Sequence, residues 1–439
     1  MTRVAGWVAA ATGGRLVSGA PDALAAGDVC VDTRLLAPGD VFVALPGEQV
    51  DGGAFVRAAL EAGAGGVVAA PAHLSGVAGG AFAVAVDDPH AALRALAVAW
   101  RGELAFAHAV GVTGAAGKTT TKDMVAALLA PHLAVHATRH GFNTHQGVAA
   151  TVAGAPEATQ ALVVELGQRH LGDIAALAEI LRPTAAVITN VGPEHLETMG
   201  SVERVAEGKA QLLAALPPGA PCVVPAGEPL LAPYLRADLR VTTFGAGGDV
   251  ALAGCDGATA TIALPDGPVR VRTPLSQAHN LENLVTAVAL VHALGLRPPA
   301  ELAPLATPLR WQLGRRVGDV DLVLDCAKTS PLALRRALEA FCAEPAAGRR
   351  IAVLGELPDL GEVAGAHHAE AGALATRLGV DVLVTVGPNA TAYLAGWEGP
   401  HHAATGAREA RALLERIGRP GDRALVKGRR ADALEDIGG

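Results

Sequence analysis

The feature that most constrains this chain is a strand, a glycine-rich loop and a helix start in direct succession. An apolar run at 107–112 leads into GVTGAAGKTTTKD (111–123), and apolar residues then recur at helical spacing up to residue 129. Such a loop presents backbone N–H groups and a helix N-terminus to phosphate. The residues that we expect to bind phosphate are Gly114, Ala115, Ala116, Gly117, Lys118, Thr119 and Thr120. Lys118 is expected to reach the terminal phosphates of ATP and Thr119 to bind Mg²⁺.

Two other interpretations of the loop are less consistent with its residues. Val112 stands where the general pattern GxxxxGK[ST] has its first glycine, so the match is one residue off. A dinucleotide-binding turn also contains spaced glycines, but it needs no lysine after the last one. A purely structural glycine-rich turn would need neither the lysine nor the threonines. The Lys118–Thr119 pair therefore favours a nucleotide-phosphate loop.

Bulk properties narrow the class of protein. A chain of 439 residues is too long for one hydrophobic core, so several domains are expected. The net charge of −8 gives no support for nucleic-acid binding. Five scattered cysteines are typical of reduced thiols in a cytoplasmic protein. The long uncharged run 62–86 divides into two short buried strands, 65–70 and 81–86, so no membrane insertion is expected.

Short valine-rich strands alternate with helical stretches along most of the chain. Clear examples of such strands are 161–167, 184–192, 349–357 and 381–387. This rhythm is typical of α/β folds with parallel, doubly wound sheets. We expect three domains, 1–105, 106–309 and 310–439, with a proline-rich linker at 297–311. The segment 219–275 is expected to be a β insertion or meander.

Several polar residues follow predicted strands, where open α/β sheets place their sites. Glu165 ends one strand and His195 follows another, so together with Thr119 they could bind Mg²⁺. Glu165 could equally be a strand-end residue that faces water, and a lone histidine after a strand is more often structural than a ligand. Asn283 lies in a polar patch that opens an apolar helix, which indicates either base recognition or helix capping. Asp325 ends a further strand.

The order and spacing of these motifs resemble the Mur ligase family, and within it the MurF branch. The resemblance covers nearly the whole chain. It rests on these segments: VDTRLLAPGDVFVALPGEQVDGGAFV (31–56), GVTGAAGKTTT, VELGQRHLGDI, TNVGPEHLETMGSVERVAEGKAQL, HNLEN, GRR, LGELPDLGE and LVKGRRA.

The resemblance implies a nucleotide-sugar-binding first domain, a phosphate-loop ATPase domain and a Rossmann-like third domain. It also implies a reaction in which a carboxylate attacks the γ-phosphate of ATP, and an amine then attacks the acyl phosphate. Lys118, Glu165, His195 and Lys209 would be catalytic, with two Mg²⁺ ions and with Lys209 carbamylated as in several family members. Asn283 would contact adenine, and Arg315 and Asp325 would complete the ATP site when the domains close.

Substrate contacts are also carried over from the resemblance. A carboxylate substrate linked to UDP is expected to meet the first two domains at Thr33, Arg34, Asp51, Asn143 and Thr144. The amine is expected to meet the third domain at Lys328, Ser330, His368 and Lys427. The partners implied are therefore small molecules, with no nucleic acid and a monomeric enzyme.

The chain departs from the MurF pattern mainly in one loop. MurF has a sequence close to DSYNANP where this chain has DCAKTSP (325–331), and DGH where it has DGG (51–53). Losing a tyrosine and two asparagines should change the amine that binds. We therefore favour a MurF-like paralogue, in specialised metabolism. The alternative is the peptidoglycan enzyme of that branch, which adds D-alanyl-D-alanine; a non-catalytic nucleotide-binding protein is a further alternative. A folylpolyglutamate-synthetase-like ligase is disfavoured by the block at 31–56.

Overall fold

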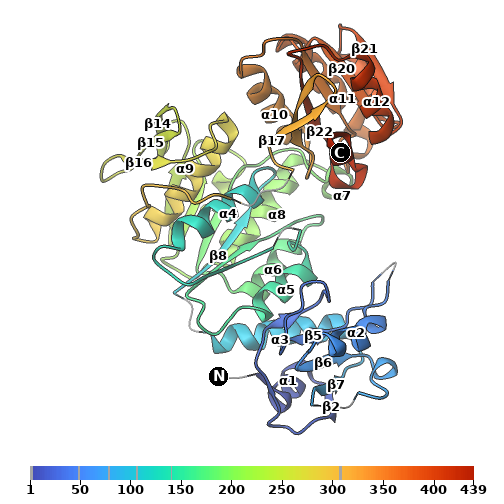
Figure 1. Cartoon of the computed structure of the whole chain (residues 1–439). Helices are drawn as coiled ribbons and strands as arrows, with labels where there is room; N and C mark the ends of the chain where they lie inside the picture. Colours follow the sequence, from blue (N-terminus) through green and yellow to red (C-terminus); the bar gives the residue numbers. More distant parts are fainter. Residues whose placement is uncertain (1–2, 48–49, 78–79, 105–106, 140, 306–308) are drawn as a thin grey trace.

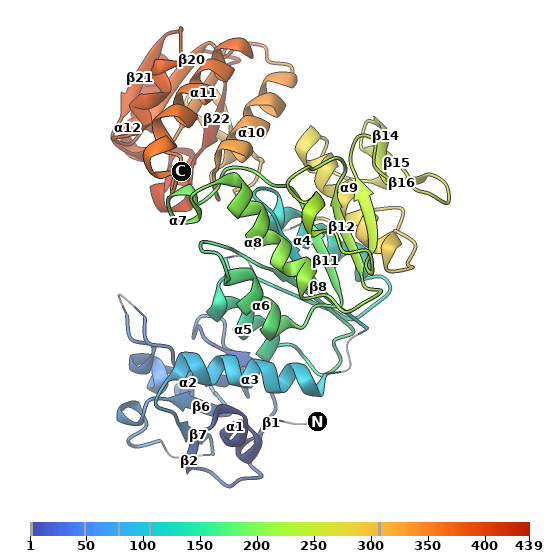
Figure 2. The same ribbon diagram turned by 180° about the vertical axis from the view of Figure 1, so that it is seen from behind.

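Three α/β units follow one another along the chain, and Figures 1 and 2 show the first and last at opposite ends of the central one. The computed structural model describes residues 3–47, 50–77, 80–104, 107–139, 141–305 and 309–439. The predicted α/β class and three-part architecture are confirmed. The predicted boundary between residues 105 and 106 lies outside the described residues, and the one at 309/310 remains a prediction.

The first unit is built on a five-stranded sheet of order β2-β7-β6-β5-β4, parallel except for the antiparallel pair β2–β7. Its strands are β2 (Arg15–Ser18), β4 (Val29–Cys30), β5 (Val41–Val43), β6 (Gly66–Ala69) and β7 (Phe82–Ala85). Its helices are α1 (Ala5–Thr12), α2 (Val56–Glu61) and α3 (Pro89–Glu103), and β1 (Arg3–Val4) pairs with β3 (Leu24–Ala25). Asp88 caps α3 by accepting from the backbone N–H groups of its first turn.

The central unit is a six-stranded parallel sheet of order β13-β12-β11-β8-β10-β9. Its strands are β8 (His108–Thr113), β9 (Val135–Ala137), β10 (Ala161–Glu165), β11 (Ala185–Ile188), β12 (Pro221–Pro225) and β13 (Arg240–Phe244). The helices are α4 (Lys118–Leu129), α5 (His145–Ala153), α6 (Asp173–Leu181), α7 (Leu196–Met199), α8 (Val202–Ala214) and α9 (Ala278–Ala293). β8 lies in the middle, so the phosphate loop that follows it is central.

Successive side chains along each central strand point to opposite faces of the sheet, and each face packs into its own hydrophobic core. In β10, Leu162 and Val164 pack with α5, α6 and α8 on one face, while Val163 packs with α4 and α9 on the other. Because both faces are covered, the inner strands β8, β10, β11 and β12 are largely apolar, as parallel strands in α/β proteins are.

The predicted β insertion at 219–275 is only partly right. β12 and β13 belong to the central parallel sheet, since β12 pairs with β11. Only β14 (Ala251–Asp256), β15 (Thr259–Ala263) and β16 (Val269–Arg272) form a separate antiparallel meander. The sequence does not distinguish the two, because short apolar strands between turns look alike whichever sheet they join.

The third unit has a six-stranded sheet of order β17-β18-β22-β19-β20-β21, in which only β17 is antiparallel to its neighbour. Its strands are β17 (Gln312–Val317), β18 (Val320–Asp325), β19 (Arg350–Leu354), β20 (Val382–Val386), β21 (His401–Ala404) and β22 (Arg423–Lys427). The helices α10 (Pro331–Ala343) and α11 (Ala364–Arg377) pack on one face, and α12 (Ala407–Ile417) packs on the other.

Candidate active site

The phosphate loop joins β8 to α4 and is held open by hydrogen bonds from the neighbouring strand end. The amide of Asn190 accepts from the backbone N–H of Ala116 at 2.7 Å and donates to its carbonyl at 2.9 Å. Gly117 has a φ of +77°, and a Cβ there would lie 2.3 Å from the side-chain oxygen of Asn283. Glycine is therefore required at this position, both for the backbone conformation and for the close approach of α9.

A buried chain of charges links the loop to α8. The carboxylate of Glu194 accepts from the Lys118 ammonium at 3.3 Å and from the Lys209 ammonium on its other oxygen. Lys209 is 0% exposed and Glu194 4%. Two ammonium groups thus share one carboxylate in a place where an unpaired charge would be very costly.

The pKa values follow from this arrangement. Burial alone would raise the pKa of Glu194, but the ammonium groups of Lys118 and Lys209 overcome it and lower that pKa to about 2. Burial lowers the pKa of Lys209 to about 8, in spite of its carboxylate partner. Glu194 therefore stays ionised at neutral pH, whereas Lys209 titrates close to neutral pH.

Glu165 and Thr119 form an oxygen-rich cluster at the end of β10. The Thr119 hydroxyl donates to the Glu165 carboxylate at 2.7 Å, and Asn143 donates to its other oxygen at 2.8 Å. Burial opposes ionisation of Glu165, yet Lys118 and the Thr119 hydrogen bond lower its pKa. Thr144, next to Asn143, caps α5 by accepting from a backbone N–H.

These donors fit one Mg²⁺ ion. A carboxylate and a hydroxyl oxygen beside a phosphate loop are the hard ligands that Mg²⁺ uses together with substrate phosphates and water. Among the described residues no group of three or more His, Cys, Asp or Glu could hold a metal ion. The predicted second ion and the ligand role of His195 therefore remain predictions.

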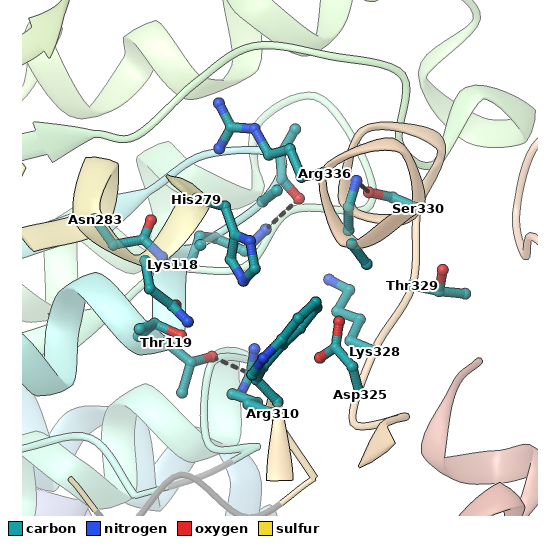
Figure 3. A pocket seen from close by; sticks show the side chains of 18 of the residues that line it. Lys118, Thr119, His279, Asn283, Arg310, Asp325, Lys328, Thr329, Ser330 and Arg336 are labelled. Carbon is teal, nitrogen blue, oxygen red and sulfur yellow. Dashed lines mark hydrogen bonds between the residues drawn. The ribbon is translucent and has the colours of Figure 1, made fainter. Parts of the chain in front are cut away.

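A cavity opens beside the loop, between the central and third units (Figure 3). Its walls include Ala115–Thr120, Glu165, His279, Asn280, Asn283, Arg310, Trp311, Asp325, Lys328–Ser330, Ala333, Arg336, Ala337 and Lys427. Three buried polar atoms of this wall have no hydrogen-bond partner: His279 Nδ1, Trp311 Nε1 and Thr329 Oγ1. Unsatisfied groups of this kind are expected where a ligand supplies the partner.

The linker contributes a different arginine from the predicted one. Arg315 is exposed, donates to the carbonyl of Gly439 at 3.0 Å and does not line the cavity. Arg310 does line it and donates to the Thr119 hydroxyl at 3.0 Å, as Figure 3 shows. Arg315 points away because it lies on the edge strand β17, beside the chain terminus. The structure thus places Arg310, and not the predicted Arg315, beside the phosphate loop.

His195 makes a contact between the units that was not predicted. Its Nδ1 lies 2.9 Å from the carboxylate of Asp359, in the third unit. Both residues have positive φ, 50° and 59°, which non-glycine residues rarely adopt. Burial and the Lys328 ammonium lower the pKa of His195. A carboxylate on one ring nitrogen orients the imidazole and leaves the other nitrogen to face a ligand.

The residues predicted to receive the amine divide into two groups. Lys328, Ser330 and Lys427 line the cavity, so the structure places them beside the phosphate loop. His368 does not: its ring nitrogens face the backbone N–H of Leu357 at 3.1 Å and a carbonyl at 2.6 Å within the third unit. Because both nitrogens are used in the core, the expectation for His368 is corrected to a structural role.

Lys427 and Asp325 form an ion pair at 2.9 Å at the ends of the adjacent strands β22 and β18. Lys427 also donates to the carbonyl of Lys328 at 2.8 Å. Ser330 caps α10 by accepting from the backbone N–H of Ala333 at 3.3 Å. Lys427 and Ser330 therefore shape the loop that carries Lys328.

The predicted contacts in the first unit lie away from this cavity. Thr33 is partly buried, and Arg34 is exposed and pairs with Asp32. Asp51 lies 3.0 Å from His73, and a Cβ on Gly53 would lie 2.2 Å from the His73 ring. The imidazole of His73 thus occupies the space into which a side chain at position 53 would extend.

Sequence reasoning missed several residues of the cavity. Trp311 and Arg336 carry no motif of their own, His279 has no predicted role although it begins the HNLEN segment, and Arg310 precedes the GRR segment that contains the predicted Arg315. The backbone on either side of Arg310 is in the left-handed region, with φ of 58° at Leu309 and 56° at Trp311. Such strain commonly marks a functional constraint, but only coordinates reveal it.

Comparison with known families agrees with this architecture. Models of the Mur ligase middle domain, of the Mur ligase glutamate ligase domain and of the Mur ligase family catalytic domain match residues 112–291, 309–430 and 28–101, respectively. The UDP-N-acetylmuramoyl-tripeptide–D-alanyl-D-alanine ligase of Synechocystis sp. is 33% identical over 411 residues, covering 91% of this chain and 88% of the relative.

Solved structures extend the similarity to three dimensions. MurF from Acinetobacter baumannii superposes with a TM-score of 0.85 at 25% identity, covering 100% of this chain and 98% of that one. MurF from Thermotoga maritima, in complex with ADP, gives a TM-score of 0.78 at 26% identity, with 94% and 96% covered. The chain therefore belongs to the Mur ligase family, whose members are ADP-forming ligases that make amide bonds.

Proposed function

We propose that this protein uses ATP and Mg²⁺ to join D-alanyl-D-alanine to UDP-N-acetylmuramoyl-tripeptide, releasing ADP and phosphate. The observation that carries the proposal is the cavity in which the phosphate loop meets cations and carboxylates of two units. Support for the substrates comes from the curated relatives, which match over most of their length and bear this activity in their names. These relatives favour the peptidoglycan enzyme over the specialised paralogue.

The proposed reaction has two steps. An oxygen of the substrate carboxylate attacks the γ-phosphorus of ATP, the bond to the β–γ bridging oxygen breaks, and ADP leaves. The amine then attacks the acyl carbon, a C–N bond forms, the C–O bond to phosphate breaks, and the amine loses a proton. Lys118 and Arg310 neutralise charge on the phosphates, and Asn283 faces the base. Mg²⁺, held at Thr119 and Glu165, would supply further charge neutralisation on the phosphates.

The test is ADP release with UDP-N-acetylmuramoyl-tripeptide and D-alanyl-D-alanine, with the amide detected by mass spectrometry. We expect turnover only when both substrates and Mg-ATP are present. Lys118→Met should abolish it, whereas Arg408→Ala, an exposed change on α12, should not. Unchanged biological activity of Lys118→Met would favour a non-catalytic nucleotide-binding protein.

The paralogue with a different amine is kept as a second candidate because of the divergent loop 325–331. Lys328 in that loop adds a cation to the cavity where MurF has an asparagine. Ligation of another amine, with no turnover of D-alanyl-D-alanine, would favour this candidate.

Carbamylation of Lys209 is also part of the proposal. A lysine with a pKa of about 8 has an appreciable neutral fraction at mildly alkaline pH, and only the neutral amine reacts with CO₂. Carbon-13 NMR of protein incubated with labelled bicarbonate should show a carbamate signal that Lys209→Arg removes. A protein that lacks the signal but turns over normally would exclude the modification.

We further propose the domain boundaries 105/106 and 309/310, a monomeric enzyme and a cytoplasmic location. Five cysteines without disulfides are consistent with a reducing compartment. Within the described residues, no helix is both long and apolar enough to cross a membrane.

A further inference from the structure

The lysines of this chain are few, and most lie around one site. The sequence has only five, at positions 118, 122, 209, 328 and 427, against thirty arginines. Lys118, Lys328 and Lys427 line the cavity, and Lys209 pairs with Glu194 beside it. Nearly every other cation of the protein is an arginine. Lysine binds phosphate as a compact point charge on a flexible stem, whereas arginine offers a planar fork of donors.

Lys328 differs from the other cavity lysines because its ammonium has no carboxylate partner. Lys118 and Lys209 share Glu194, and Lys427 pairs with Asp325. Within the described part of the chain, no carboxylate lies within salt-bridge distance of Lys328. Its side chain is exposed to the cavity, although protein atoms surround the ammonium closely. In Figure 3 it extends from the side of Asp325 toward the middle of the cavity.

Lys328 also lies near Lys118. The charge of Lys118, followed by burial, lowers the pKa of Lys328 to about 8, and Arg310 adds to the repulsion. Glu194 and Glu165 act in the opposite direction, but each is already bonded to other groups. Positive charges held together in this way are stabilised when an anion comes between them.

We propose that Lys328 binds the terminal phosphate of ATP, so that the third unit supplies a second ammonium opposite Lys118. This inference rests on the proposed function, because it places ATP in the cavity. Lys328 forms no covalent bond and stays protonated while it contacts the transferred group. The cation thus belongs to phosphoryl transfer rather than to recognition of the amine, and it acts only when the two units are in contact.

The test measures nucleotide binding in the absence of both other substrates, with Mg²⁺ and either ADP or the non-hydrolysable analogue AMP-PNP. Lys328→Asn should weaken AMP-PNP binding roughly tenfold to a hundredfold and ADP binding far less, since a hydrogen bond to a charged group is lost only with the analogue. Lys328→Arg should recover part of the loss. Arg335→Gln removes an exposed cation from α10 outside the cavity and should bind both nucleotides normally.

Four outcomes would count against one proposal or the other. Equal losses for ADP and AMP-PNP would overturn the assignment to the terminal phosphate. Unchanged AMP-PNP binding with a raised KM for the amine would return Lys328 to amine recognition. Unchanged nucleotide binding together with unchanged kinetics would show that Lys328 has no role in the reaction. If the unmodified protein bound neither nucleotide, the proposed function itself would fail. Retained ADP binding by Lys328→Asn shows that the variant is folded.

Discussion

Replacing Glu194 by glutamine should destabilise the central unit through charge rather than shape. The variant keeps the volume but leaves the buried ammonium groups of Lys118 and Lys209 without their shared carboxylate. Removing one partner from a buried ion pair typically costs about 3–5 kcal/mol. We expect a loss of this size at pH 7. Glu197→Gln, an exposed change three residues further on, should cost less than about 0.5 kcal/mol.

The dependence on pH provides the sharper test. The folded pKa of Glu194, about 2, lies below the unfolded value, so its stabilisation is complete above about pH 4.5 and is lost as the pH falls toward 2. The part of the stability difference between wild type and Glu194→Gln that comes from the carboxylate should therefore narrow as the pH falls below about 4.5.

A protein of several units does not unfold in two states, so the assay should report on the central unit alone. Hydrogen exchange of peptides from α8 gives the free energy of opening of that helix, and calorimetry gives the melting temperature. A loss below about 1 kcal/mol at pH 7 would refute the buried-charge argument. A loss near pH 2 as large as the loss at pH 5 would show that packing, not charge, is responsible.

Three further predictions follow from single contacts. Arg310→Gln should weaken Mg-ATP binding about tenfold, whereas Arg315→Gln should leave it unchanged; the opposite result in a binding titration would restore the original assignment. Asp359→Asn should raise the Mg²⁺ concentration needed for half-maximal AMP-PNP binding about tenfold without changing the KM for the amine. An unchanged Mg²⁺ titration would contradict the role of Asp359 in orienting His195. Gly53→His should lower the melting temperature, because the new Cβ would lie 2.2 Å from the His73 ring. Combining it with His73→Ala should recover part of that loss, whereas additive effects would show that the two side chains do not compete for the same space.

Much of the site could be predicted because it is local in the sequence. The loop at 111–123 is one continuous segment, and its glycines, lysine and threonines act on phosphate through the backbone that they themselves form. Glu165 could be placed because it ends a strand that pairs with β8 in register, Glu165 beside Val112. Predictions of this kind succeed when one strand and its neighbour are sufficient to position the side chain.

Residues that act across unit boundaries could not be predicted in this way. Arg310 and Arg315 are five positions apart in the same polar stretch, and only the turn of the linker decides which one faces Thr119. His368 looks equally available in the sequence, yet both its nitrogens bond to backbone in the core.

The family, the α/β class and the phosphate loop follow from the sequence alone, because periodicity and a contiguous motif encode them. The positions of Lys328 beside the phosphate loop and of Asp359 beside His195 are visible only in three dimensions. The physical reason is that these contacts join segments from separate units. Whether a charge meets water, a carboxylate or another cation depends on how those units pack, and no local pattern in the sequence records that packing.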